Sequence, residues 1–478
     1  MTLQRKKHLP LALLCAALCI SGSALVATLP AQAATPASSS QRVLQPRAVL
    51  DTMEKVADWQ LANPTGYPLD DWTEGVGDAG FMALSGISPD PKYREAMRAA
   101  GEKLQWRLGP SKFHADDHVV GQMYSELYLQ LRDPRMIAKM RAQFDEMLAE
   151  PRPGSLNWLV PDVLHRWAWC DSLFMGPGAW ARLSAVTGDQ RYLDYALKNW
   201  WLTSDYLYDK EEHLYFRDSR YFTKKEDNGK NVFWGRGNGW VLAGLARMLQ
   251  YIPDNRPERE RFVQQYREMS ERIVGLQQAD GLWRASLLDP NSYQSAETSG
   301  TGLYTYALAW GVNQGILPRD KFAPAVKRAW QALNASVQAN GKLVNVQPIG
   351  ADPKHFDPQS SDVFAIGSFL MAGAEMYRMG IEESGSLRVV TVQNNGSAPR
   401  LDSPVDVADV GDLAVMDALT TRLLQTVVVG KSLQFRTDVA PGETRRYLLI
   451  PRSRVSSATP KAANQPVVGG TLKVSVSR

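Results

Sequence analysis

A seven-residue segment, Trp234-Gly235-Arg236-Gly237-Asn238-Gly239-Trp240, combines residue types that suit the binding of an acidic sugar. Its two indoles offer flat apolar faces, its guanidinium group fits a carboxylate, and its three glycines let a ligand approach the backbone. The apolar run VLAGLARMLQYI follows directly. The segment therefore also fits a glycine-rich turn before a helix whose tryptophans belong to the core, and on its own it favours neither interpretation.

A second segment, HRWAWCDSLFM (165–175), places one carboxylate among aromatic and apolar residues. Desolvation in such surroundings raises the pKa of Asp171. A carboxyl group whose pKa approaches neutrality can donate a proton and later take one back, as general acid/base catalysis requires. The alternative is that Asp171 caps a helix or pairs with Arg166.

The segment HADDHVVGQ (114–122) carries adjacent acids at the predicted start of a helix. Acidic residues at such a position are often N-caps, which the helix dipole stabilises. Because consecutive helical positions point in different directions, only one of Asp116 and Asp117 can face a central cavity while the other caps. The flanking histidines match none of the usual zinc or calcium spacings, so we expect no metal site.

Three further segments contain candidates, each with a simpler alternative. The loop segment RDSRY (217–221) carries Arg220, which is either a ligand-binding residue or a surface arginine that ties the loop. The segment ETSGT (297–301) precedes a helix, so its carboxylate and hydroxyl groups also fit capping. Trp72, next to Asp71, fits a core position as well as a ligand contact.

Apolar residues recur with helical spacing from about residue 45 to residue 380 and predict roughly twelve helices that come in pairs. The expected spans are 47–63, 72–86, 90–106, 116–132, 134–149, 166–187, 190–204, 236–252, 257–278, 300–315, 319–339 and 361–379. Six pairs in a closed ring would form an (α/α)6 barrel. A tetratricopeptide-like stack is the alternative, but its fixed period of about 34 residues is not evident, because the loops at 205–235 and 279–299 are long and irregular.

After about Ser384 the sequence changes to short β-rich runs such as LRVVTV and RRYLLI, which are separated by turn residues. The predicted fold is therefore an all-α, (α/α)6 barrel over residues 45–383 with a small C-terminal β-rich domain over 384–455. Residues 456–478 have the composition of a flexible tail.

The first 33 residues have the pattern of a secretory signal peptide, and residues 34–44 of a linker. Three basic residues, an apolar stretch and Ala31-Gln32-Ala33 follow one another, so we expect an exported, periplasmic or secreted protein. Removal of the three basic residues lowers the formal net charge from +4 to +1, which gives no reason to expect nucleic acid or a membrane as a partner. Only Cys170 would remain, in an apolar run that favours a buried structural thiol.

Five motifs, taken in order, resemble glycoside hydrolase family 105, the unsaturated rhamnogalacturonyl hydrolases. They are HADDHVVGQ, RWAWCDSLFM, RDSRYF, WGRGNGWVLAGLARML and AETSGTGLYTYALAWGVNQGIL, and the likeness covers most of residues 45–380. The resemblance implies an (α/α)6 barrel that acts, without a cofactor, on unsaturated uronic acids left at the non-reducing end by polysaccharide lyases.

The resemblance also implies roles for individual residues. Asp171 matches the general acid/base and Asp116 the supporting aspartate, with Asp117 as the fallback. The expected substrate-binding residues are Trp72, His165, Trp167, Met175, Arg220, Trp234, Arg236, Asn238, Trp240, Glu297 and Thr301. One departure is Gly176-Pro177-Gly178, where a more regular Ala-Pro-Pro-like turn is expected, and this leaves open the shape of the cavity next to Met175.

The chemistry follows from the substrate. A 4,5-unsaturated uronate carries a vinyl ether, and protonation of C4 creates an oxocarbenium-like centre at C5 that water can trap. Asp171 would deliver this proton and then deprotonate the water, whereas ordinary glycosidases attack the anomeric carbon with two carboxylates. Asp116 would help to keep Asp171 protonated by charge repulsion, and Arg236 or else Arg220 would hold the uronate carboxylate.

The main expectation is an unsaturated rhamnogalacturonyl hydrolase, a monomer or homodimer, whose partner is an unsaturated uronyl oligosaccharide. One alternative is an unsaturated β-glucuronyl hydrolase acting on ulvan or other glucuronyl-linked oligosaccharides. An endo-acting glycosidase or a lyase on a similar helical scaffold is another. A non-catalytic exported sugar-binding protein is the alternative from a different class, and it would keep Trp234 and Trp240 but need no pair of aspartates.

Overall fold

The structure is a computed structural model that describes residues 42–455 and 472–477. The expected signal peptide (1–33), most of the expected linker and residues 456–471 of the expected tail lie outside the described residues. No helix in the described ranges is long and apolar enough to cross a membrane.

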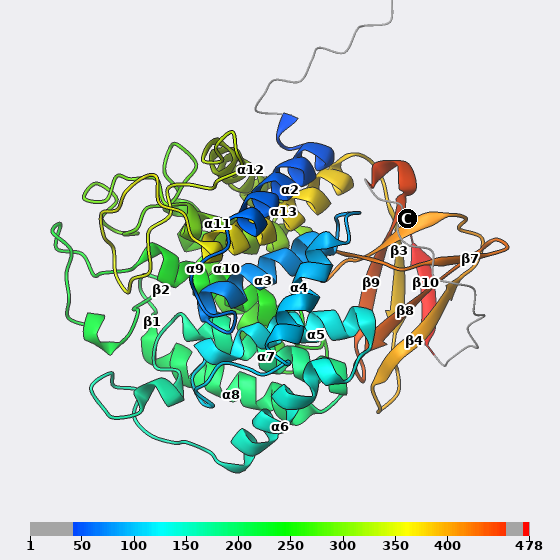
Figure 1. The fold of residues 1–478 in the computed structure, drawn as a ribbon, viewed down its shortest axis with the longest axis horizontal. Coiled ribbons are helices and arrows are strands. Elements are labelled where there is room, and N and C mark those ends of the chain that lie inside the picture. Colours follow the sequence, from blue (N-terminus) through cyan, green and yellow to red (C-terminus); the bar gives the residue numbers. More distant parts are fainter. Residues whose placement is uncertain (1–41, 456–471, 478) are drawn as a thin grey trace, which may run out of the picture. The chain divides into compact units, whose positions relative to one another are not determined.

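Twelve α-helices form the described chain up to Glu383 (Figure 1). They are α2 (Pro46–Ala62), α3 (Trp72–Ser85), α4 (Lys92–Lys103), α5 (Val120–Leu131), α6 (Arg135–Ala149), α7 (Ser172–Thr187), α8 (Gln190–Leu207), α9 (Gly235–Leu249), α10 (Arg259–Gly275), α11 (Thr298–Asn313), α12 (Arg319–Ala335) and α13 (Val363–Glu383). Their bounds lie within a few residues of most expected spans. The main difference is the span 166–187, because Trp167 has a positive φ of 58° and the α-helix begins only at Ser172.

The odd-numbered helices form a closed cycle of contacts. α3 contacts α5, and the contacts continue through α7, α9 and α11 to α13, which in turn contacts α3. Nearly every residue of α9 and α11 is buried, whereas α10 and α12 bury mainly one face. A helix that is buried on all sides lies inside a protein, and one with a single apolar face covers it. The odd-numbered helices therefore form an inner layer and the even-numbered helices an outer one.

Two glycines bring the backbones of α3 and α13 into contact. A Cβ atom on Gly80 would lie 2.4 Å from the carbonyl oxygen of Gly367, and one on Gly367 would lie 2.2 Å from that of Val76. Cβ atoms do not approach backbone oxygens so closely. Glycine at both positions therefore allows the cycle of inner helices to close.

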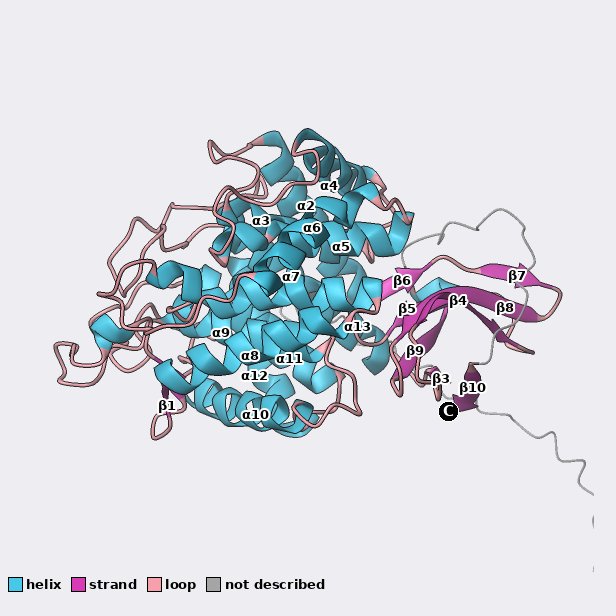
Figure 2. Ribbon diagram, turned by 90° about the horizontal axis from the view of Figure 1, so that it is seen from below, coloured by secondary structure: helices cyan, strands magenta, loops and turns pink. Residues whose placement is uncertain are grey.

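Two antiparallel sheets follow α13 (Figure 2). One has the strand order β10-β3-β9-β5-β6 and the other β4-β8-β7. The strands are β3 (Arg388–Gln393), β4 (Arg400–Val407), β5 (Leu413–Asp417), β6 (Arg422–Leu424), β7 (Val427–Val429), β8 (Ser432–Val439), β9 (Thr444–Pro451) and β10 (Lys473–Ser477). A shared apolar cluster joins the sheets, with Val390, Val415 and Tyr447 from the first and Leu433 and Phe435 from the second. A short hairpin, β1 (Tyr208–Asp209) and β2 (Leu214–Tyr215), lies within the helical part of the chain.

The C-terminal residues differ from the expected flexible tail. Lys473–Ser477 form β10, which pairs with β3 along its whole length. The sequence KVSVS alternates in polarity, which is the pattern of a half-exposed edge strand. The β-rich region therefore extends beyond residue 455.

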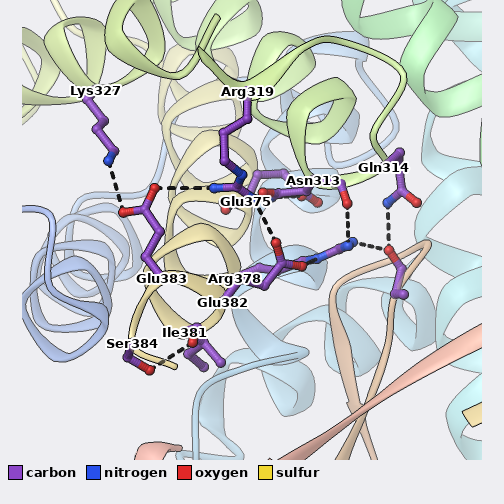
Figure 3. A network of polar contacts seen from close by, with 11 residues as sticks. Asn313, Gln314, Arg319, Lys327, Glu375, Arg378, Ile381, Glu382, Glu383 and Ser384 are labelled. Carbon is purple, nitrogen blue, oxygen red and sulfur yellow. Dashed lines mark hydrogen bonds and ion pairs between the residues drawn. The ribbon is translucent and has the colours of Figure 1, made fainter. Parts of the chain in front are cut away.

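Arg378 on α13 fastens the β-rich region to the helices (Figure 3). Its guanidinium group donates to the carbonyl oxygen of Ala418 and, at 2.6 Å, to that of Asn313. Gln314 donates to the same Ala418 oxygen at 2.6 Å. The turn between β5 and β6 is therefore held against the ends of α11 and α13.

Candidate active site

The candidate residues gather at the N-terminal ends of the inner helices. Trp72 begins α3, Asp116 lies just before α5, and Asp171, Trp234 and Glu297 precede α7, α9 and α11. Ring contacts join the N-terminal ends of α3 and α9, and a charge interaction joins those of α5 and α7. A helix N-terminus carries a partial positive charge, so this arrangement favours an anionic ligand.

Asp171 is the N-cap residue of α7 and its side chain is largely buried, with 9% of the residue exposed. Burial raises its pKa, while the charge of Arg217, a hydrogen bond from Cys170 and the charge of Arg236 act in the opposite direction. The Cys170 thiol donates to Asp171 Oδ2 at 3.3 Å, and Arg217 Nε lies 3.7 Å from the same oxygen. Asp171 is thus a desolvated carboxyl group whose raised pKa is moderated by the charges of Arg217 and Arg236.

Asp116 is the electrostatic partner of Asp171. Burial raises its pKa well above the ordinary value, and the charge of Asp171 raises it further. Its Oδ1 atom is buried and has no hydrogen-bond partner among the described residues. Repulsion between the two carboxylates therefore favours a state in which one carboxyl group of the pair is protonated.

Asp117 has a different set of partners. Its side chain accepts a hydrogen bond from the backbone N–H of Ser111 at 3.1 Å, and its Oδ2 lies 3.6 Å from His114 Nδ1. Burial raises its pKa to about 6. Of the two adjacent acids, Asp116 is the one that interacts with Asp171, and Asp117 anchors the preceding loop.

Tryptophan rings line the N-terminal ends of α3 and α9. Trp72 lies edge-on to Trp240, with 6.2 Å between ring centroids and an interplanar angle of 90°. Trp240 also packs 5.1 Å from Phe174, and Trp72 packs 5.3 Å from Phe364. Trp72 is partly exposed, whereas Trp234 and Trp240 are almost fully buried. The indoles of the glycine-rich segment are therefore core residues, as one of the two sequence interpretations held.

Arg236 is buried against the ring of Trp234. Its guanidinium group lies 4.5 Å from the Trp234 ring and donates to the backbone oxygens of Gln347 at 2.6 Å and Pro348 at 2.8 Å. A third bond reaches Ser299 at 3.2 Å, and Nε is buried without a partner in the described ranges. Most hydrogen-bond donors of Arg236 thus hold the loop that follows α12, and only part of the guanidinium group remains available to a ligand.

The structure places Arg217, which was not among the expected site residues, beside Asp171. The backbone N–H of Cys170 donates to the carbonyl oxygen of Arg217 at 2.8 Å, which brings the two segments together. Asp218 is fully buried and binds both arginines, and both guanidinium groups lie over the ring of Trp158. Arg220 is exposed and ties the loop, as its simpler interpretation held. Arg217 and Arg220 flank Asp218 in the sequence, and the sequence alone did not indicate which of them lies beside Asp171.

Trp169, His114 and Trp158 form a second aromatic group. Trp169, which sequence reasoning did not select, stacks on His114 at 5.0 Å and meets Trp158 edge-on at 6.4 Å. Burial, with a smaller contribution from His165, lowers the pKa of His114 to about 4, so this ring is neutral at neutral pH. His165 Nδ1 is buried and lacks a hydrogen-bond partner in the described residues. The position of Trp169, two residues before Asp171, was its only signal in the sequence.

Four expected substrate-binding residues have structural contacts instead. Asn238 exchanges hydrogen bonds with the backbone of Tyr215, and the Glu297 carboxylate caps α11 through two backbone N–H groups. The Thr301 hydroxyl accepts a hydrogen bond from the backbone N–H of Trp283. Trp167 Nε1 donates a hydrogen bond to the backbone oxygen of Phe113 at 3.2 Å. Each is buried, and its hydrogen bonds hold the backbone around the candidate site.

The departure at Gly176-Pro177-Gly178 has a packing explanation. These residues lie within α7, next to the buried Met175. A Cβ atom on Gly176 would lie 2.9 Å from the Trp167 ring, and one on Gly178 would lie 2.8 Å from the Gln122 side chain. The glycines therefore make room for these two neighbours. Among the described residues, no group of three or more His, Cys, Asp or Glu side chains is arranged to hold a metal ion.

Comparisons with known proteins agree with this fold. The family described as Glycosyl Hydrolase Family 88 matches residues 40–380. An unsaturated 3S-rhamnoglycuronyl hydrolase of Formosa agariphila is 37% identical over 354 residues, which cover 71% of this chain and 93% of that protein. A protein of the same description from Alteromonas sp. (strain LOR) is 34% identical over 347 residues, which cover 68% of this chain and 84% of that protein.

A solved structure from Salmonella enterica, described as a possible member of the GH105 family, has the same fold. It superimposes with a TM-score of 0.59 at 20% identity and covers 73% of this chain and 97% of that one. That structure shows the shared fold, and the predicted resemblance is confirmed by the family model and the two relatives. The chain is a glycoside hydrolase and belongs to Glycosyl Hydrolase Family 88.

Proposed function

We propose that this enzyme removes a 4,5-unsaturated uronic acid from the non-reducing end of lyase-generated oligosaccharides by hydrating its vinyl ether. The observation that carries this proposal is the pair of Asp171 and Asp116, two coupled and desolvated carboxyl groups. They lie at the N-terminal ends of α7 and α5, beside the cations Arg217 and Arg236. A single acid whose pKa is adjusted by nearby cations suits the protonation of a carbon atom. This reaction needs no second carboxylate as a nucleophile.

We infer that the helices form an (α/α)6 barrel, in which the odd-numbered helices are the inner ring. The closed cycle of contacts from α3 to α13 supports this arrangement. Such a ring collects six helix N-termini around one opening, so the substrate's carboxylate would enter a region of positive potential.

Asp171 is the general acid and then the general base of the proposed reaction. Its proton goes to C4, the π electrons of the double bond form the new C4–H bond, and C5 becomes cationic. Water then attacks C5 while Asp171 takes one of its protons, which restores the acid. The hemiketal at C5 opens the ring and leaves a hemiacetal at C1, which loses the neighbouring sugar without further help.

The uronate carboxylate would lie between Arg217 and Arg236. Arg217 keeps 15% of its side chain exposed and has a buried Nε atom without a hydrogen bond in the described ranges. When a carboxylate neutralises Arg217, the cation no longer lowers the pKa of Asp171, which then rises further above its ordinary value. Binding of the substrate would thus protonate the acid that attacks it.

We propose that the leaving sugar is a rhamnose unit, because the two relatives that cover most of this chain are unsaturated 3S-rhamnoglycuronyl hydrolases. Rhamnogalacturonyl and glucuronyl substrates with this leaving sugar share the same reacting ring. We also propose that the protein is exported, on the basis of its N-terminal sequence pattern.

The test uses a panel of lyase-generated unsaturated disaccharides that differ in the uronyl linkage and in the leaving sugar. Loss of the ultraviolet absorbance of the double bond reports turnover, and the intact polysaccharide and a saturated disaccharide are the controls. The proposal predicts that only unsaturated substrates react and that a rhamnose-linked one reacts fastest. Cleavage of the saturated disaccharide at a similar rate would contradict it.

A further inference from the structure

A cavity of about 720 Å³ lies at the other end of the inner helices. Its helical wall comes from the C-terminal halves of α3, α5, α7, α9 and α11, whereas the candidate active site lies at their N-terminal ends. Its second wall comes from the β-rich region, including the turn between β5 and β6 and parts of β8 and β9. Cavities of this size commonly hold a small ligand.

Four polar atoms on the β-rich wall are buried and have no hydrogen-bond partner in the described part of the chain. They are Thr420 Oγ1, Arg422 Nε, Gln434 Oε1 and Arg445 Nε, and all four residues line the cavity. Buried polar atoms in native proteins are nearly always bonded to protein, ligand or ordered water. Four such atoms around one cavity mark a site that is built to bind a polar molecule.

Arg422 gives this site a positive charge. It makes no hydrogen bond or ion pair with another described side chain, whereas three of the lining acids, Glu126, Asp417 and Glu443, are each paired with other arginines. A further lining acid, Glu375, accepts hydrogen bonds from Asn313 and Thr421. Burial raises the pKa of Glu126, but two neighbouring arginines and, more weakly, Arg422 reverse the shift. The guanidinium group of Arg422 is therefore available to an incoming anion.

The backbone that carries Arg422 is fixed in place. Thr421 donates to Glu375 on α13 at 2.9 Å, and the backbone N–H of Leu423 donates to the carbonyl oxygen of Gly86 at 2.8 Å. Arg378 and Gln314 hold the preceding turn, as Figure 3 shows. Because the turn is already ordered, the binding of a ligand to Arg422 requires little further ordering of the turn and loses little entropy.

We propose that this cavity is a second, non-catalytic binding site for a small acidic sugar, which Arg422 recognises through a carboxylate or a sulfate ester. Thr420, Gln434 and Arg445 supply further hydrogen-bonding atoms for hydroxyl groups, and the rings of Tyr251 and Phe435 line the same cavity. Much of the wall lies beyond residue 380, where the family match ends, so the site belongs to this chain's added β-rich region. The proposal does not depend on the catalytic role of Asp171.

Equilibrium dialysis of the full chain against glucuronate tests the proposal, with glucose and inorganic sulfate as parallel probes. The expected result is two bound glucuronate ions per chain, one at each end of the inner helices. Arg422→Gln should weaken one of them by roughly tenfold or more, since it removes a charge-assisted hydrogen bond, and leave the other unchanged. Arg446 is exposed on the same sheet, and Arg446→Gln should leave both bound glucuronate ions in place.

Sulfate bound at the Arg422-dependent site would identify the sulfate ester as a ligand, and its absence there would assign the site to carboxylates.

Hydrogen exchange of the segment 417–425 keeps the test independent of folding defects. Glucuronate should slow exchange of this segment in the wild type and in Arg422→Lys, which keeps the charge, but not in Arg422→Gln. Glucuronate binding in the wild type that Arg422→Gln leaves unchanged would overturn the proposal, because the orphaned atoms would then be hydrated only. Binding of glucose as tight as that of glucuronate would overturn it as well, because the site would then not recognise an anion.

Discussion

The Arg217 side chain lies 3.7 Å from Asp171, measured from Nε to Oδ2, and the backbones of Arg217 and Cys170 are joined by a hydrogen bond of 2.8 Å. A fixed cation at this distance lowers the proton affinity of a buried carboxyl group. Burial acts in the opposite direction and is the larger effect, since the net shift of the Asp171 pKa is upward. Arg217 therefore limits a shift that burial alone would make greater.

Arg217→Gln should move the pH dependence of the reaction. The acid must be protonated, so kcat/KM falls as pH rises through the pKa of Asp171. Without the cation this pKa rises further, and the alkaline limb of the profile moves to higher pH, while KM increases because the uronate loses a charge partner. Arg220→Gln is the matched control, since Arg220 binds the same Asp218 but is exposed. An unmoved limb, or an equal effect of both variants, would show that Arg217 does not tune the acid.

Asp116→Asn should change the pH dependence of stability. Burial and the charge of Asp171 raise the folded-state pKa of Asp116 above its unfolded value of about 3.9. Such a group contributes stability that is fully present at low pH and is lost as pH rises through the folded-state pKa. The variant lacks this loss, so its free energy of unfolding relative to the wild type should increase from acidic to alkaline pH. Urea unfolding at several pH values measures it, and a pH-independent difference would refute the raised pKa.

Arg236→Met should mainly weaken substrate binding. The guanidinium group is proposed to hold the uronate in both the ground state and the transition state, and loss of such uniform binding raises KM more than it lowers kcat. We expect KM to rise by about tenfold or more. Because Arg236 also binds backbone oxygens of Gln347 and Pro348, circular dichroism should accompany the kinetics. A wild-type KM in a folded Arg236→Met variant would assign the carboxylate to Arg217 alone.

Gly80→Ala should destabilise the contact between α3 and α13. The new Cβ atom would meet the carbonyl oxygen of Gly367 at 2.4 Å, so one backbone must move. Overpacking of this kind costs about 1–3 kcal/mol, which thermal unfolding can measure. Gly66→Ala is the control, because its Cβ atom would meet nothing within 4 Å. Equal melting temperatures for the two variants would mean that the helices are not in close backbone contact.

Most of the helical part of the fold could be predicted from the sequence, because hydrophobic spacing reports which residues of a helix are buried. The spans of α3, α6 and α12 begin within a residue of their expected starts. The alternating pattern of β10 was missed, because its five residues follow a segment with the composition of a flexible tail. Hydrophobic spacing could not predict the late start of α7, which depends on the positive φ of Trp167.

The site was predictable where chemistry is local and not where it depends on contacts between segments. Asp171 stood out because its aromatic neighbours are adjacent in sequence. Arg217 did not, because its position depends on a hydrogen bond to the distant Cys170. Asn238 and Glu297 have the same residue types as sugar-binding side chains, and only their hydrogen bonds to the backbone show that they support the site structurally.

The rate of Asp171→Asn on an unsaturated uronyl disaccharide tests the central claim most directly. The substitution keeps the shape of the side chain but removes the proton donor, so the loss of ultraviolet absorbance should slow by about 10²–10⁴-fold. Circular dichroism and the melting temperature should stay close to those of the wild type, since a buried carboxyl group is replaced by a neutral one. A folded Asp171→Asn variant that hydrates the substrate at the wild-type rate would contradict the account.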